Sequence, residues 1–160
     1  MSEDFIDFNE FTKIKFIEKA KKYCSYRDRC QFEVATKLKE WDVDENISEE
    51  IITALIIEKF LDEERFTRSF IRGKFRMNKW GKRKIVVALK QKRINSNLIN
   101  YCLDEIDEEE YQNCLIEILE KKNKEISGNN KTLKIQKLRN YAFSRGFEYD
   151  LINEIITENF

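Results

Sequence analysis

Apolar residues recur every three or four positions along most of the chain, which is the period of an amphipathic α-helix. Phe16, Ala20 and Tyr23 show this spacing in one segment, and Leu115 and Leu119 show it in another. The pattern predicts nine helices, near residues 12–24, 29–41, 48–60, 62–77, 81–92, 95–106, 107–126, 131–146 and 148–159.

Polar residues mark several of the predicted helix ends. The segment from Ser25 to Asp28 has the form of a capping box, in which side chains satisfy the backbone amides of the first helical turn. Asp62, Glu63 and Glu64 place carboxylates at a helix start, where the helix dipole favours anions. Residues 127–130, Ser-Gly-Asn-Asn, are typical of a loop.

The composition agrees with an all-α fold. The 160 residues are enough for about one domain with a buried core. They include no Pro and only 4 Gly, which disfavours an all-β fold because such folds need frequent turn residues. Charged residues make up 38% of the chain, as expected for helices with solvated outer faces.

The predicted helices fall into three similar units of three. Leu38, Leu89 and Ala142 occupy corresponding positions, and an apolar pair follows the next turn in each unit. In the first unit that turn carries an apparent insertion at residues 44–47. Three helices per unit in tandem predict an elongated, curved array with a continuous core. The expected organisation is an N-terminal extension at 1–12 and repeats at 13–60, 61–106 and 107–160.

The formal net charge of zero conceals strong segregation of charge. Residues 61–100 carry 12 basic and 3 acidic side chains, a net charge of +9, whereas the segments before and after are acidic. From Arg65 to Arg93 there are 12 Lys or Arg and no Asp or Glu, and six acids follow at 104–110. Segregated charge of this kind favours recognition of a polyanion.

The absence of histidine excludes much catalytic chemistry. No Ser-His-Asp or Cys-His centre, HExxH zinc site or histidine acid–base catalysis is possible without it. We therefore expect no enzymatic activity, no cofactor and no small-molecule substrate. Cys24, Cys30, Cys102 and Cys114 contain no CxxC spacing, so they are interpreted as small buried residues rather than metal ligands.

The N-terminal sequence and the apolar runs indicate a cytoplasmic protein. Residues 1–5 are acidic where a secretory signal would be basic, and no apolar stretch follows them. The longest apolar run, Ile51 to Ile57, is too short to span a bilayer. We expect no contact with a membrane.

The first predicted helix of the basic block presents a cationic face. Arg65, Arg68, Arg72 and Arg76 recur at spacings of three and four, so they share one side of the helix. The opposite side, with Phe66, Phe70 and Met77, is expected to face the core. An alternative is that these arginines pair with the acids at 104–110 and only solvate the surface.

The junction before the next predicted helix concentrates further cations around one aromatic ring. Lys79, Trp80, Lys82, Arg83 and Lys84 surround the start of this helix. A helix start with uncompensated cations predicts an acceptor for phosphate or carboxylate groups. Lys92 and Arg93, at the end of the same helix, complete the set of residues that we expect to face a polyanionic partner.

Three segments resemble the RecX family of bacterial regulatory proteins. Residues 27–34, Arg-Asp-Arg-Cys-Gln-Phe-Glu-Val, are similar to its R-x-R-S-x-x-E-L signature, with Cys30 and Val34 in place of Ser and Leu. Residues 61–67, Leu-Asp-Glu-Glu-Arg-Phe-Thr, are similar to L-x-D-E-R-F-A. Residues 145–147, Arg-Gly-Phe, match a motif of the third repeat.

The second repeat carries the longest part of this resemblance. Residues 80–94 are similar to the family pattern K-G-x-x-x-I…L-x-x-K-G-I, but Arg93 stands where the pattern has its second Gly. Because glycine readily adopts a left-handed backbone, we expect a different turn conformation at Arg93. The resemblance covers about residues 13–160.

The resemblance implies a fold of three tandem three-helix repeats and a regulatory role. RecX proteins are understood to bind the RecA–DNA filament and mainly to inhibit the recombinase in DNA repair and recombination. The implied partners are the RecA filament and, weakly and in a salt-dependent manner, single-stranded DNA. Two alternatives remain: a helical module that binds DNA alone, and a helical-repeat scaffold for an acidic protein partner.

Overall fold

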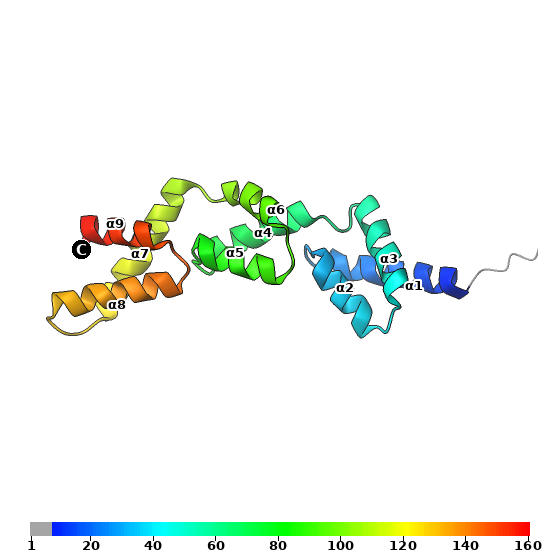
Figure 1. The fold of residues 1–160 in the computed structure, drawn as a ribbon, viewed down its shortest axis with the longest axis horizontal. Helices are drawn as coiled ribbons and strands as arrows, with labels where there is room; N and C mark the ends of the chain where they lie inside the picture. The colour runs from blue at the N-terminus through cyan, green and yellow to red at the C-terminus, as the bar shows by residue number, and fades with distance from the viewer. Residues whose placement is uncertain (1–7) are drawn as a thin grey trace, which may run out of the picture. The chain divides into compact units, whose positions relative to one another are not determined.

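The computed structural model describes residues 8–160, which form nine α-helices and one short 3₁₀-helix. Within this range the chain contains no strand, so the predicted all-α fold is confirmed. Figure 1 shows the helices in three successive sets, coloured blue to cyan, green, and yellow to red.

The first set consists of α1 (Phe8–Ser25), α2 (Gln31–Glu40) and α3 (Glu45–Ile57), which pack on one another. Their shared core contains Ala20, Val34, Leu38, Ile51 and Leu55, all fully buried. Helix α1 starts earlier than the predicted helix at 12–24. Residues 1–7, which make up most of the predicted N-terminal extension, lie outside the described residues.

The second set consists of α4 (Glu63–Arg76), α5 (Lys82–Gln91) and α6 (Ser96–Cys102), followed by the 3₁₀-helix η1 (Leu103–Glu105). The third set consists of α7 (Glu108–Glu125), α8 (Lys131–Ser144) and α9 (Tyr149–Asn159), which pack on one another. The predicted loop at 127–130 separates α7 from α8, as expected.

The helices form two compact units. The first unit contains residues up to Thr67 together with Lys92–Ile94, and the second contains Arg68–Gln91 and Asn95–Phe160. In the second unit, ring contacts join the second and third sets of helices: Tyr111 lies 5.8 Å from Phe75 and 5.0 Å from Phe147, measured between ring centroids.

The predicted correspondence between repeats is confirmed in the core. Leu38, Leu89 and Ala142 are each completely buried. The predicted insertion at 44–47 is wrong, because α3 begins at Glu45 with Asp44 as its N-cap. Asn95 occupies the equivalent position as the N-cap of α6. The turn before α6 and the turn before α3 therefore have equal length.

The turns between the second and third helices of the repeats share one backbone conformation. Asp42, Arg93 and Gly146 have φ values of 57°, 59° and 96°, all in the left-handed region. The expectation that Arg93 changes this turn is therefore wrong. The arginine adopts the conformation that glycine would supply, at a local cost of about 1 kcal/mol.

Helix caps differ in part from those predicted. Ser25 is the last residue of α1, so the capping box predicted for it is wrong. A capping box does occur five residues later, at the start of α2, where the Cys30 amide donates a hydrogen bond to the Glu33 carboxylate over 3.3 Å. Asp62 caps α4 as expected, because its carboxylate accepts a hydrogen bond from the Arg65 amide over 2.9 Å.

The four cysteines are buried and free, as predicted. Burial raises the pKa of Cys24, Cys30 and Cys114, which keeps these thiols protonated. Residues 8–160 contain no group of three or more metal-binding side chains. None of the helices in the same range has the length and apolar character needed to cross a membrane.

Candidate functional site

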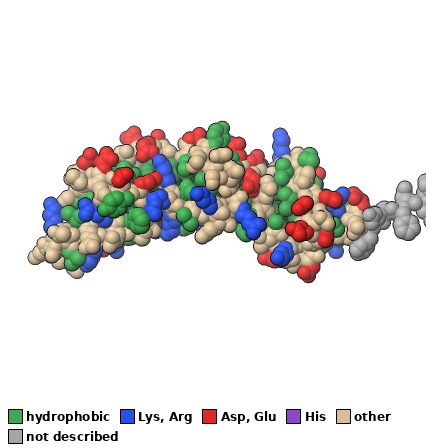
Figure 2. All heavy atoms as spheres, viewed as in Figure 1, with side chains coloured by type: hydrophobic (Ala, Val, Ile, Leu, Met, Phe, Trp, Pro, Cys, Tyr) green, Lys and Arg blue, Asp and Glu red, His purple; other side chains and the backbone are tan. Residues whose placement is uncertain are grey.

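The arginines of α4 face acidic side chains of the same unit. Arg68 Nη1 lies 2.6 Å from Asp104 Oδ1, and Arg72 Nη1 lies 3.1 Å from Glu105 Oε2. Arg76 is 3.7 Å from Glu110. Figure 2 shows acidic side chains gathered near the start of α7, beside basic ones. The pairing with the acids at 104–110, which was an alternative in the sequence analysis, is therefore present.

The side of α4 opposite the arginines was predicted to face the core, and only part of it does so. Phe66 is buried, but Met77, which was expected to face the core, is 84% exposed. Arg65 belongs to the first unit and is not part of the row formed by Arg68, Arg72 and Arg76. It pairs instead with Asp28, with its Nε 2.9 Å from the carboxylate.

The backbone amides at the start of α5 already have acceptors within the chain. The Gly81 amide donates to the Arg145 carbonyl over 2.8 Å, and the Arg83 amide donates to the Gly146 carbonyl over 3.0 Å. The Lys82 amide donates to the Tyr111 hydroxyl over 2.9 Å. These three amides are therefore not free to bind a phosphate, so the acceptor predicted at this helix start depends on the cationic side chains.

Tyr111 connects this helix start to the third repeat. Its hydroxyl donates a hydrogen bond to the Glu148 carboxylate over 2.6 Å while it accepts the one from Lys82. Burial and the bond to Glu148 raise the pKa of Tyr111 well above its ordinary value. The phenol therefore stays protonated and keeps donating at every physiological pH.

The cationic side chains of the junction divide into paired and unpaired groups. Lys82 lies 2.8 Å from Glu108. Lys79, Arg83 and Lys84 have no carboxylate within 4 Å in the part of the chain that the structure describes. We call these three residues the junction cations. Arg83 lies 4.1 Å from the Phe143 ring and donates to the Phe147 carbonyl.

Trp80 is half-buried. The ammonium groups of Lys74 and Lys84 lie 4.8 and 4.6 Å from the centre of its ring. Cations near an indole face interact with it favourably and keep their charge accessible to solvent. At the start of α5, the junction cations thus form a group beside Trp80 that no carboxylate of the described residues neutralises.

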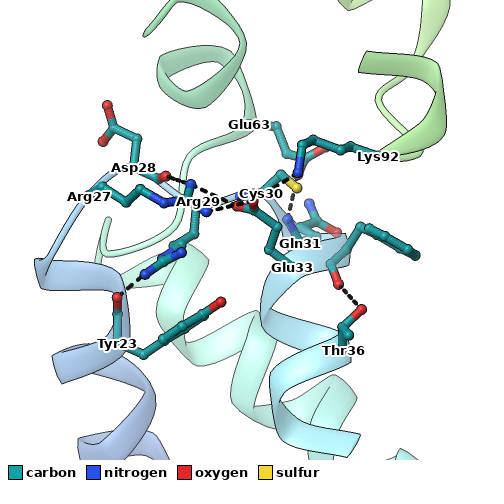
Figure 3. Close-up of polar contacts among 11 residues, drawn as sticks. Tyr23, Arg27, Asp28, Arg29, Cys30, Gln31, Glu33, Thr36, Glu63 and Lys92 are labelled. Atoms are coloured by element: carbon teal, nitrogen blue, oxygen red, sulfur yellow. Dashed lines mark hydrogen bonds and ion pairs between the residues drawn. The ribbon is translucent and has the colours of Figure 1, made fainter. Parts of the chain in front are cut away.

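Lys92 and Arg93 belong to the first compact unit, whereas the junction cations belong to the second. Lys92 Nζ lies 3.0 Å from Glu33 Oε1, and the Arg93 guanidinium lies 4.9 Å from the Phe32 ring. Figure 3 shows the polar network around Glu33, into which Lys92 points. Glu33 therefore neutralises Lys92 in the first unit, whereas Arg93 is exposed and has no carboxylate within 4 Å among the described residues.

The network in Figure 3 also contains the signature residues at 27–34. Arg27 pairs with Glu33 over 2.8 Å, and the Gln31 amide donates to the Glu63 carboxylate over 2.6 Å. Burial by itself would raise the pKa of Glu33, but hydrogen bonds from Arg27 and Lys92 outweigh it and lower the pKa. The signature thus holds the start of α2 against the start of α4.

Models of the three RecX domains match the chain in order. The first three-helix domain matches residues 17–55, the second 62–103 and the third 108–156. The chain belongs to the RecX family. Each matched range coincides with one of the helix sets, so the predicted relationship and the three-helix repeats are confirmed.

Curated relatives of the chain are RecX regulatory proteins. One from Clostridium acetobutylicum is 32% identical over 164 residues, covering 100% of this chain and 72% of its own length. Another, from Lactobacillus johnsonii, is 36% identical over 95 residues, or 59% of this chain. The chain spans about a third to a half of some of the relatives it matches, with 35% and 50% in two cases.

A solved RecX structure has the same fold. RecX from Lactobacillus salivarius superimposes with a TM-score of 0.84 and 27% sequence identity, covering 91% of this chain and 95% of that one. The curated relatives carry the name regulatory protein, and the domain models name no catalytic activity.

Proposed function

We propose that this chain regulates a RecA-type recombinase by binding the RecA–DNA filament, mainly to inhibit it. The observation that carries the proposal is the ordered match of all three RecX domains over residues 17–156. A recombinase filament is a cytoplasmic assembly that holds single-stranded DNA, so the proposal includes a weak, salt-dependent contact with that strand.

The junction cations and Trp80 are the proposed contact surface in the second repeat. Lys79, Arg83 and Lys84 have no carboxylate partner among the described residues, so an approaching polyanion does not have to displace one. The α4 arginines belong to this surface only after their pairs with Asp104, Glu105 and Glu110 open. The Arg76–Glu110 pair is exposed and therefore weak, so a phosphate can replace its carboxylate. Arg68 and Glu105 are only 21% and 20% exposed, so their pair opens less readily.

The experiment measures recombinase ATPase on single-stranded DNA with and without the protein. Arg83→Glu/Lys84→Glu replaces two attractions with two repulsions, so inhibition should fall by about ten-fold or more. Lys82 is left unchanged because its loss would free Glu108. The control, Lys121→Glu/Lys137→Glu, makes the same charge change at exposed positions of the third repeat.

The two variants should differ in inhibition while having similar melting temperatures. Inhibition retained by Arg83→Glu/Lys84→Glu would rule out the junction as the working surface. Inhibition that is absent in the parent protein would rule out the regulatory proposal itself. Binding to free DNA with the same affinity as to the filament would favour a plain DNA-binding module.

A further inference from the structure

The first unit carries a second surface of aromatic and cationic side chains, which the sequence analysis did not identify. Phe16 and Tyr23 of α1 meet Trp41 at the end of α2. The Phe16 and Trp41 rings are stacked, with centroids 6.1 Å apart and planes inclined by 24°. The three rings pack against the core and are half-buried, so part of each residue faces solvent.

The lysines of α1 divide between two faces. Lys13 and Lys21, on the side of α3, pair with Glu50 and Glu58 across the helix interface, over 3.2 and 2.7 Å. Lys15 and Lys19, with ammonium groups 5.9 and 5.8 Å from the centre of the Phe16 ring, are exposed, and so is Lys22 further along the helix. No carboxylate among the described residues lies within 4 Å of these three lysines. They are spaced by four and three residues, so they form one row: Lys15, Lys19 and Lys22.

Cations already lie over the exposed ring faces. The Lys19 ammonium is 4.2 Å from the centre of the Trp41 ring. The Arg29 guanidinium is 3.9 Å from the Tyr23 ring, and Figure 3 shows it donating to the Tyr23 carbonyl. We call the three rings together with Lys15, Lys19 and Lys22 the α1 platform.

We propose that the α1 platform binds single-stranded nucleic acid. Bases stack on aromatic faces, and cations beside these faces attract the phosphates. The Asp and Glu side chains of an acidic peptide would pair with the lysines but offer no aromatic face that stacks on the rings as a base does. When a base stacks on Trp41, the Lys19 ammonium moves from the ring to a phosphate. The platform lies in a different repeat from the junction cations and does not require the recombinase.

The fluorescence of Trp41 tests this proposal directly. The chain has 2 tryptophans, so Trp80→Phe leaves Trp41 as the only indole emitter. Titration of this variant with a short oligothymidylate at low salt, without recombinase, should quench the emission because a base stacks on the ring. The apparent affinity should fall steeply with salt.

Two charge variants in the same background locate the binding site. Lys15→Glu/Lys19→Glu/Lys22→Glu should weaken the quenching titration by about ten-fold or more, because three phosphate contacts become repulsive. The control, Lys121→Glu/Lys124→Glu/Lys137→Glu, carries the same net charge change at exposed positions of the third repeat and should bind like the parent. Circular dichroism melting verifies that both variants are folded.

Three outcomes would overturn the proposal. The first is Trp41 emission that does not change when oligothymidylate is added. Titration of the Trp80→Phe protein without any charge variant is enough to detect this outcome. The second is equal weakening by both triple variants, which would indicate only diffuse electrostatic attraction. The third is equal quenching by polyglutamate, which would identify a surface for acidic proteins. None of these outcomes affects the proposed regulation of the recombinase.

Discussion

Two glycines allow the second and third repeats to meet through their backbones. A Cβ atom on Gly81 would lie 2.2 Å from the Gly146 carbonyl carbon and 2.3 Å from the Phe147 nitrogen. No real Cβ contact is this short, and backbone atoms cannot move aside as a flexible side chain can. Gly81→Ala should therefore lower the free energy of unfolding by about 2 kcal/mol or more, measured by urea denaturation.

Gly73 supplies a matched control for this substitution. It lies inside α4, and a Cβ atom there would meet nothing within 4 Å. Gly73→Ala should raise the free energy of unfolding by about 0.5–1 kcal/mol, because alanine restricts the unfolded chain. Similar losses in both variants would contradict the role assigned to the Gly81 contact.

Glu33 makes the first unit sensitive to acid. Because its pKa is lowered in the folded protein, its contribution to stability is fully present above its ordinary pKa of 4.5 and is lost as the pH falls through the folded value. Glu33→Gln removes the charge-assisted bonds from Arg27 and Lys92 and should cost about 1–3 kcal/mol at pH 7. The cost should shrink below pH 4.5, as melting curves across pH would show. A loss that is the same at pH 7 and at low pH would mean that these ion pairs do not stabilise the fold.

Single residues mark the limit of what the sequence could predict. The equivalence of Leu38, Leu89 and Ala142 was predictable, because apolar spacing is a local pattern. The left-handed turn at Arg93 was not, because a non-glycine residue rarely adopts positive φ and only the surrounding turn requires it. Met77 was misplaced because the helix ends one residue earlier, at Arg76.

At the scale of elements, the acidic segment 104–110 shields the arginine face of α4. Asp104 and Glu105 lie within 2.6–3.2 Å of Arg68 and Arg72. Asp104→Asn/Glu105→Gln removes this competition, so single-stranded DNA should bind more tightly. The log–log slope of affinity against salt should become steeper by about 1, because additional phosphates are neutralised. Fluorescence anisotropy of a labelled oligonucleotide measures both changes.

A pair of acids elsewhere controls for net charge. Glu117→Gln/Glu120→Gln changes the net charge equally at exposed positions of α7 that have no described ion pair. This variant should leave the salt slope unchanged. An equal gain in affinity for the two variants would show that overall charge, and not the shielding of α4, limits DNA binding.

The pairing of the α4 face with the acidic segment could not be derived from the sequence. Spacing placed Arg68, Arg72 and Arg76 on one side of a helix correctly, because helical periodicity is local. Their partners lie more than thirty residues away, with Arg68 and Asp104 separated by 36 positions. Only the folded chain decides whether such segments meet, so the alternatives of a bare and a neutralised face stayed open.

At the scale of the whole molecule, a net charge of zero makes free DNA a poor ligand. Only the second repeat carries a net positive charge, so the junction cations and the α1 platform are local cationic surfaces on a chain that repels phosphate elsewhere. If about four to six phosphates are neutralised, the log–log slope against salt should be roughly −3 to −5. Anisotropy titrations across a range of salt concentrations measure this slope. Tight binding that is insensitive to salt would contradict an electrostatic contact.

The repeat organisation was the most predictable feature of the molecule. Three RecX three-helix domains follow one another along the chain, and their threefold repetition was predictable because each unit repeats the same apolar spacing and the same turn. The elongated, curved arrangement of these units stays a prediction. A radius of gyration above the value of roughly 15 Å expected for a compact chain of this length would support it.

Hydrogen exchange at the start of α5 also reports how often the second and third repeats separate. Amide protons in the first turn of a helix ordinarily exchange with solvent in the absence of intrahelical acceptors. Those of Gly81, Lys82 and Arg83 are instead covered by the Arg145 carbonyl, the Tyr111 hydroxyl and the Gly146 carbonyl. Their deuterium uptake therefore records how often the second and third repeats part, while the amides of the first unit record its own opening.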